Sequence, residues 1–187
     1  AESVLNVIDK NEPLRKYAGP DQWNDPDMLQ VGNGMSIVQD RAHFAMWCMM
    51  AAPLIAGNDL TTMTSETLAI LTNPEAIAIN QDSLGVQAFK YSSFDSIDVW
   101  FKPLIRGEWA VCFLNRGRSA QEFLFQWSGH HIVDAVADRE VDFSTEQFYI
   151  RDMWDRRSLG ITAEPLVATL PGYDVLMLRL CLSDEAR

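Results

Sequence analysis

The sequence predicts an α/β segment over residues 1–85, followed by an all-β domain over residues 86–187. Two features of the sequence predict this division. Ser36 and Gln39 have the spacing of a helix capping box and open a long apolar stretch. After Val86 the apolar residues recur at every second position, as they do along strands.

Three helices are expected in the first part. The first begins at the Ser36 cap and ends before Pro53, and its apolar composition predicts that it is buried. Two short helices follow over residues 65–71 and 74–80, where Asn73 is placed to cap the second. Between them and the first helix, the apolar run 53–57 is bounded by Pro and Gly, which predicts a short strand covered on both faces.

The second part is expected to form six to eight antiparallel strands packed as a sandwich. Alternation at residues 97–101 repeats at 109–113, after a turn at Arg106 and Gly107. Further apolar runs lie at residues 123–127, 148–154, 166–170 and 175–180. Because no long linker separates the two parts, we expect them to pack against each other.

Composition excludes several classes of partner. The chain has 15 basic and 26 acidic residues, a formal charge of -11, so nucleic acid is not expected to bind. The longest apolar stretch, Phe44–Gly57, is interrupted at Pro53 and is too short to cross a membrane. The three cysteines lack a metal-site or redox spacing and are expected to be buried thiols, and the three histidines form no triad. We therefore expect no metal and no cofactor.

The segment Gly19–Leu29 concentrates the side chains with useful chemistry. Three carboxylates, an amide and an indole fall within seven residues. Pro26 favours an extended backbone before it, and an extended segment would point Asp25 and Asp27 to one side, with Cα atoms roughly 6.5–7 Å apart. Retaining glycosidases use two carboxyls about 5–5.5 Å apart, but we do not assign catalysis to this pair.

A purely structural interpretation competes with a functional one in this segment. Asn24 and Asp25 are suited to cap local backbone N–H groups in an Asx-type turn, and Trp23 is suited to a core. We favour the structural interpretation for these three residues and the functional one for Asp27.

Four motifs in order closely resemble the melibiase-type α-galactosidases, glycoside hydrolase family 27. They are WNDPDML at 23–29, VGNG at 31–34, AAPLIAGNDL at 51–60 and AINQDSLG at 78–85. The resemblance implies that residues 1–85 are the closing part of a (β/α)8 TIM barrel, followed by an antiparallel β-sandwich domain. It also places the seventh barrel strand at 25–29 and the eighth at 54–58.

The same resemblance assigns roles to residues of the first motif. Asp27 and Met28 stand where the family contacts galactose, the carboxylate binding hydroxyls and the methionine forming an apolar wall. Trp23 and Asp25 are candidates for supporting this pocket. The chain departs from the family at Asp21–Gln22, where most members carry two glycines, and the Asn33–Gly34–Met35 turn is one glycine short. Since glycine tolerates positive φ, a different backbone path into the pocket is expected.

The resemblance further implies that the chain holds no catalytic residue. The family hydrolyses terminal α-galactosides with retention, through an aspartate nucleophile on barrel strand four and an aspartate acid/base on strand six. Both strands would precede Ala1, and a barrel needs about 250 residues. We expect the chain alone to be inactive and to expose an apolar patch. It should then aggregate, form a homo-oligomer or pair with the missing amino-terminal part of the barrel.

Other interpretations stay open at the level of the sequence. Related family members act on α-N-acetylgalactosaminides or β-L-arabinopyranosides. The β-domain could instead be a carbohydrate-binding module with stacking tryptophans, of which Trp100 is the one placed for exposure, or the chain could be a structural remnant. Because most family members are secreted, periplasmic or lysosomal, we expect a secreted or periplasmic location.

Overall fold

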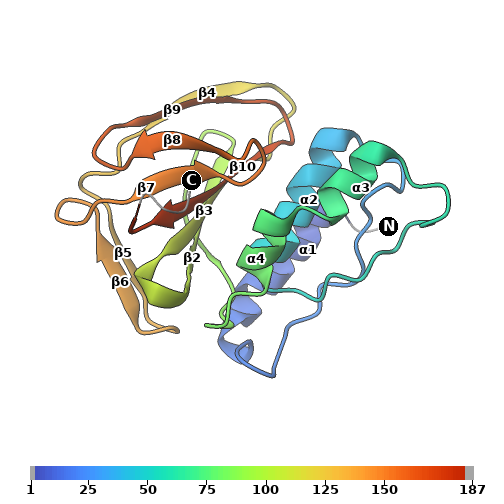
Figure 1. Cartoon of the computed structure of the whole chain (residues 1–187), viewed down its shortest axis with the longest axis horizontal. Coiled ribbons are helices and arrows are strands. Elements are labelled where there is room, and N and C mark those ends of the chain that lie inside the picture. The colour runs from blue at the N-terminus through green and yellow to red at the C-terminus, as the bar shows by residue number, and fades with distance from the viewer. Residues whose placement is uncertain (1–2, 184–187) are drawn as a thin grey trace.

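The structure is a computed structural model that describes residues 3–183. The helices and most of the extended segments of the first 88 residues form one layer, and the strands form a second part packed against them (Figure 1). The helical elements are α1 (Val4–Asn11), η1 (Glu12–Tyr17), α2 (Ile37–Met49), α3 (Ser65–Leu71) and α4 (Pro74–Asn80).

The predicted helices are confirmed, and their caps form as the sequence indicates. At the start of α2 the Ser36 hydroxyl accepts from the Gln39 N–H at 3.4 Å, while the Gln39 side chain accepts from the Ser36 N–H at 3.0 Å. The Asn73 side chain accepts from the N–H groups of Glu75 and Ala76 at the start of α4. These contacts lie within three residues, which is why sequence spacing alone finds them.

The β-domain is a sandwich in which all strand pairs are antiparallel. Its strands are β1 (Phe89–Phe94), β2 (Ile97–Pro103), β3 (Trp109–Asn115), β4 (Gln121–Phe125), β5 (His131–Asp134), β6 (Arg139–Asp142), β7 (Tyr149–Asp152), β8 (Arg157–Ile161), β9 (Leu166–Leu170) and β10 (Val175–Cys181), with the 3-10 turn η2 (Ile105–Gly107) between β2 and β3. Six strands form one sheet in the order β1-β2-β3-β10-β7-β8, and β4-β9 and β5-β6 form two further pairs. The ten strands among the described residues exceed the expected six to eight, because β5, β6 and β8 are short and each has at most two apolar residues.

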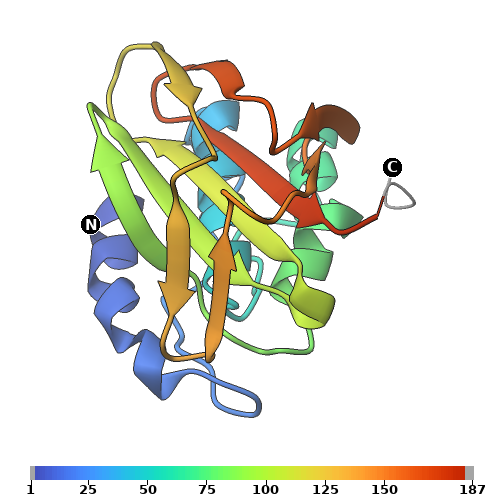
Figure 2. The same cartoon turned by 90° about the vertical axis from the view of Figure 1, so that its left-hand side faces the viewer.

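Both faces of the central strands are buried. One face, which includes Val99, Phe101 and Phe113, packs inside the sandwich against the smaller sheets. The other face, which includes Trp100 and Cys112, packs against the helices. Figure 2 shows this layering, with α2 behind the large sheet and the β5–β6 hairpin in front of it. The expectation that the two parts pack together is therefore confirmed.

The idea that Trp100 is exposed is wrong. Its side chain is 0% exposed. The face of β2 that carries Trp100, opposite the apolar face formed by Val99 and Phe101, is covered by the helical part. Trp109 and Trp127 are also buried, and Trp154 is half-buried. These tryptophans do not form a surface on which a sugar ring could stack.

Four arginine–carboxylate pairs join the helical part to the sandwich. They are Arg15–Asp134, Arg41–Asp174, Arg116–Asp9 and Arg151–Glu75. Arg15 and Arg41 belong to the helical part, and Arg116 and Arg151 belong to the sandwich. Each part therefore contributes both arginines and carboxylates to the interface between them. Each arginine donates through two N–H groups, a geometry that fixes orientation as well as distance.

The segments predicted as barrel strands, 25–29 and 54–58, do not form strands among the described residues, but they run parallel and meet at one isolated bridge. Leu29 pairs with Ala56: the Leu29 N–H donates to Ile55 at 2.8 Å, and the Gly57 N–H donates to Leu29 at 3.1 Å. A Cβ on Gly57 would lie 2.6 Å from the Leu29 oxygen, so only glycine permits this approach. The expectation that residues 53–57 are covered on both faces is wrong, because Ile55 is 50% exposed and no strand among residues 3–183 covers that side.

Candidate functional site

The backbone at Asp27 departs from the extended conformation predicted for this segment. Asp27 has φ +82°, in the left-handed region, so the alternation that would align it with Asp25 does not apply. The Asp25 carboxylate accepts from the Asp27 N–H at 2.9 Å, and the Asp27 carboxylate accepts from the Met28 N–H at 2.7 Å. These short-range bonds bend the chain where Pro26 alone would leave it extended.

The structural interpretation holds for only one of the three residues to which it was applied. Asp25 forms the predicted Asx-type contact, as its bond to Asp27 shows. Asn24 does not cap its own segment; its amide donates to Leu14 at 2.9 Å and to Gln87 at 3.0 Å. Trp23 is not a core residue, since its side chain is 49% exposed.

Asp27 and Met28 present their side chains on the surface from a rigidly held backbone. Met28 is 47% exposed and Asp27 is also exposed, whereas Pro26 and Leu29 on either side are buried. Strained backbone persists where surrounding contacts over-determine it, and such positions cluster at functional sites. Positive φ also occurs at seven other non-glycine residues of the described chain, so the functional interpretation of Asp27 stays a prediction.

One face of α2 holds the backbone of residues 27–32. The Trp47 indole N–H donates to the Asp27 carbonyl at 2.9 Å. The Gln30 N–H donates to His43 Nε2 at 3.4 Å, and the Gly32 N–H donates to the Asp40 carboxylate at 3.0 Å. Asp40, His43 and Trp47 are spaced by three and four residues, so they share one side of the helix. Sequence reasoning assigned them no role, although polar residues at helical spacing in a buried helix were a visible signal.

Burial shifts the pKa of two of these side chains. Burial lowers the pKa of His43 to about 4, because the imidazolium is poorly solvated inside the protein. The neutral ring can accept through Nε2, which assigns its proton to Nδ1. Burial also raises the pKa of Asp40, and the bond from the Gly32 N–H partly offsets this effect.

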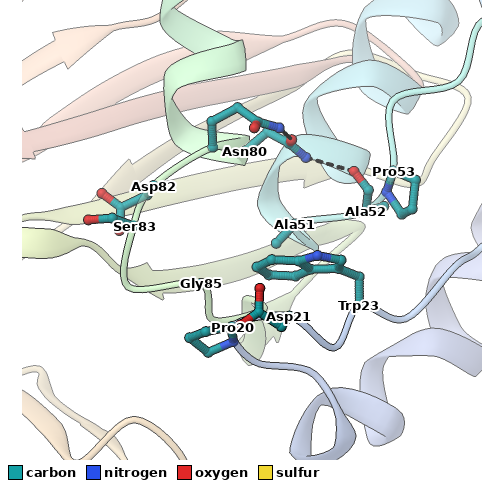
Figure 3. A pocket seen from close by; sticks show the side chains of 11 residues that line it. Pro20, Asp21, Trp23, Ala51, Ala52, Pro53, Asn80, Asp82, Ser83 and Gly85 are labelled. Atoms are coloured by element: carbon teal, nitrogen blue, oxygen red, sulfur yellow. Dashed lines mark hydrogen bonds between the residues drawn. The ribbon is translucent and has the colours of Figure 1, made fainter.

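Trp23 lines a hollow of about 340 Å³ (Figure 3), whereas Asp27 and Met28 do not line it. Its lining consists of Pro20, Asp21, Trp23, Ala51, Ala52, Pro53, Asn80, Gln81, Asp82, Ser83 and Gly85. The hollow lies where α2 and α4 end, and helices of a barrel end beside the amino ends of its strands. Barrel enzymes bind substrate at the opposite, carboxyl ends. The hollow is therefore not the predicted sugar pocket.

The segment before Trp23 contains a residue at positive φ, a conformation typical of glycine, although it has Asp21 and Gln22 where the family has two glycines. Asp21 has φ +65°, and Gly19 and Gln22 form a tight antiparallel bridge around it, with N···O distances of 2.7 and 2.9 Å. Aspartate tolerates the left-handed region better than most residues. A turn can therefore form at the point where the sequence lacks the glycine pair.

Residues 2–82 match the family described as alpha galactosidase A, and residues 94–180 match the alpha galactosidase C-terminal beta sandwich domain. The chain belongs to the melibiase-type α-galactosidase family. It is 48% identical over 177 residues to alpha-galactosidase A of Cellvibrio japonicus, covering 95% of this chain and 44% of that protein. It is 38% identical over 170 residues to an alpha-galactosidase of Oryza sativa, covering 90% and 38%.

The fold agrees with solved α-galactosidase structures. Alpha-galactosidase I from Mortierella vinacea superposes with a TM-score of 0.83 at 31% identity, covering 95% of this chain and 44% of that one. The chain therefore has the predicted architecture, the closing part of the α-galactosidase barrel followed by the β-sandwich. It spans less than half the length of the relatives named above.

The part of the chain that the structure describes holds no cluster suited to a metal. Among residues 3–183, no three His, Cys, Asp or Glu side chains gather closely enough to bind an ion. Within the same residues, no helix has the length and apolar character needed to cross a membrane. Cys48, Cys112 and Cys181 are buried free thiols, as the sequence predicts.

Proposed function

We propose that the whole protein hydrolyses terminal α-galactosides with retention, and that this chain supplies one wall of the sugar pocket through Asp27 and Met28. The observation that carries the proposal is the Asp27 backbone, held at positive φ with an exposed carboxylate beside an exposed Met28. The named relatives are α-galactosidases, which favours galactosides over the related sugars.

The two side chains suit different parts of a sugar. A fixed carboxylate accepts hydrogen bonds from hydroxyl groups without losing much side-chain entropy on binding. The methionine thioether offers a soft apolar surface to the C–H groups of the ring. Asp25 supports this wall through its bond to the Asp27 N–H, whereas Trp23 lines the separate hollow.

The residues that break the glycosidic bond would come from the rest of the barrel. Retention needs a nucleophile and an acid/base on opposite sides of the bond. In this chain the carboxylates of Asp25 and Asp27 each accept a backbone N–H, an arrangement suited to fixing a loop and binding a hydroxyl. The chain alone is therefore inactive in this proposal.

The missing part of the barrel is also the proposed partner of an exposed apolar surface. Trp23, Ile55 and Leu60 are each between 49% and 61% exposed along the extended segments of the helical part. In a complete barrel, neighbouring strands and helices would cover such side chains. In the isolated chain the same surface favours aggregation or a homo-oligomer.

The test compares the full-length protein with the purified 187-residue chain on p-nitrophenyl α-galactoside, α-N-acetylgalactosaminide and β-L-arabinopyranoside. The proposal expects the full-length protein to cleave the α-galactoside with the highest kcat/KM, and the chain to cleave none. Preference for another glycoside would refute the assigned substrate. Turnover by the chain would refute the assignment of catalysis to the rest of the barrel.

A further inference from the structure

We infer that Trp47 and His43 are positioning residues that hold Asp27 and Met28 in the geometry that binds the sugar. This inference rests on the proposed function. Neither side chain touches the surface: Trp47 and His43 are each 1% exposed. Their effect on the sugar would therefore pass through the backbone of residues 27–30.

The contact from Trp47 is specific rather than a general property of buried indoles in this protein. Its N–H donates to the Asp27 carbonyl at 2.9 Å. The indole N–H groups of Trp100 and Trp127, which are equally buried, have no hydrogen-bond partner in the structure. A buried donor without a partner is costly, so the sequence gains stability only where the indole meets a carbonyl.

Asp27 is held from both of its peptide groups. Asp25 accepts from the Asp27 N–H, and Trp47 donates to the Asp27 carbonyl. The carbonyl of Asp27 and the N–H of Met28 share one peptide plane, so the bond from Trp47 also orients Met28. Without that bond, Asp27 can relax towards the negative φ that a non-glycine residue favours, which would move the Met28 peptide with it.

His43 fixes the Trp47 ring that makes this contact. The two rings stack with centroids 4.0 Å apart and an angle of 18° between their planes. His43 Nε2 also accepts from the Gln30 N–H. The His43 ring therefore contacts both Trp47, which donates to the Asp27 carbonyl, and the backbone of Gln30. The pair therefore transmits the position of α2 to the sugar-binding segment.

The first test removes the donor from Trp47 in the full-length protein and keeps an aromatic ring. Trp47→Phe is expected to raise KM for p-nitrophenyl α-galactoside about fivefold, the effect of one hydrogen bond, while kcat changes less than about twofold. Trp100→Phe is the matched control, because it makes the same change at an equally buried indole whose N–H has no partner. It should leave KM unchanged.

The second test asks whether Trp47 acts through Asp27. In an Asp27→Asn background, Trp47→Phe should add little to KM, since the group it positions is already impaired. A purely structural role for Trp47 would give the same fold-change in both backgrounds. Equal effects in the two backgrounds, or no effect of Trp47→Phe on KM, overturn the inference.

A third pair of variants covers the case in which Trp47→Phe does not fold. His43→Ala removes the stacked ring and should raise KM, whereas His43→Phe keeps a ring on Trp47 and should restore it. Equal KM values for the two His43 variants contradict the role of the stack. Absence of α-galactosidase activity in the wild-type full-length protein would instead contradict the proposed function, and these outcomes are distinguishable.

Discussion

Lys102 of β2 donates from its buried ammonium group to the carbonyl oxygen of Ile79, in the last turn of α4, at 2.7 Å. The same group donates to Cys48, near the end of α2, at 3.2 Å. Burial lowers the pKa of Lys102 to about 8. A cation at two helix carboxyl ends is favourable because the helix dipoles place partial negative charge there. The sandwich thus anchors α2, the helix that holds the proposed sugar-binding segment.

Lys102→Ala should lower the free energy of unfolding by about 3 kcal/mol, because the Ile79 carbonyl loses the ammonium donor, the Cys48 carbonyl keeps only its backbone donors, and a cavity forms. Lys102→Met should cost less, since it fills the space and removes a buried charge. Lys90→Ala is the control, because its ammonium lies 3.7 Å from Asp98 in a more exposed pair. Urea unfolding measures all three; equal losses for Lys102→Ala and Lys90→Ala would contradict the anchoring role.

The ion pair between Arg15 and Asp134 should also matter more than pairs on the surface. The Asp134 side chain is 0% exposed, so removing Arg15 leaves a buried carboxylate without its cation. Arg15→Ala should therefore destabilise the protein by about 3 kcal/mol. Arg157→Ala, which breaks a pair with side chains 64% and 55% exposed, should cost less than about 1 kcal/mol. Similar midpoints of urea unfolding for the two variants would speak against this difference.

Histidine 43 should make the protein less stable as the pH falls from about 6.5 to about 4. Its folded pKa of about 4 lies below the ordinary value of 6.5, so only the unfolded chain binds the proton in this window. Stability is therefore full above pH 6.5 and lost towards pH 4, by on the order of 3 kcal/mol. His43→Gln cannot titrate, so its stability should vary less with pH. Parallel curves of unfolding free energy against pH for the two proteins would disprove this contribution.

Substitutions at the proposed sugar wall should impair the full-length enzyme to different degrees. Asp27→Asn keeps the shape and tolerates positive φ but loses the charge, and should lower kcat/KM by about 100-fold. Met28→Ala should lower it by about tenfold, mainly through KM, because it removes apolar contact. Glu122→Ala, at an exposed position on β4, serves as control. Unchanged kcat/KM for Asp27→Asn would remove Asp27 from the pocket.

The sequence predicts those parts of the structure that depend on near neighbours in the chain. The Ser36–Gln39 cap, the Asn73 cap and the alternation along β2 and β3 all form as expected. It fails where contacts between distant residues decide. Trp100 is buried because helices cover its face of the sheet, which alternation cannot show.

The candidate site shows the same limit. The motif that contains Asp27 and Met28 can be recognised from the sequence, but the positive φ at Asp27 cannot. Besides the local bonds of Asp25 and Asp27, that segment is held by Trp47, which is 20 residues away in the chain. The helical spacing of His43 and Trp47 could be seen in the sequence, but which backbone groups they contact depends on how α2 packs against residues 27–32.

The most direct measurement is a crystal structure of the full-length protein with galactose bound. The account predicts that an Asp27 carboxylate oxygen lies about 2.6–3.0 Å from a sugar hydroxyl, with the Met28 side chain in contact with the ring. It also predicts that the nucleophile and acid/base lie outside residues 1–187. A galactose bound away from Asp27, or in the hollow beside Trp23, would contradict it.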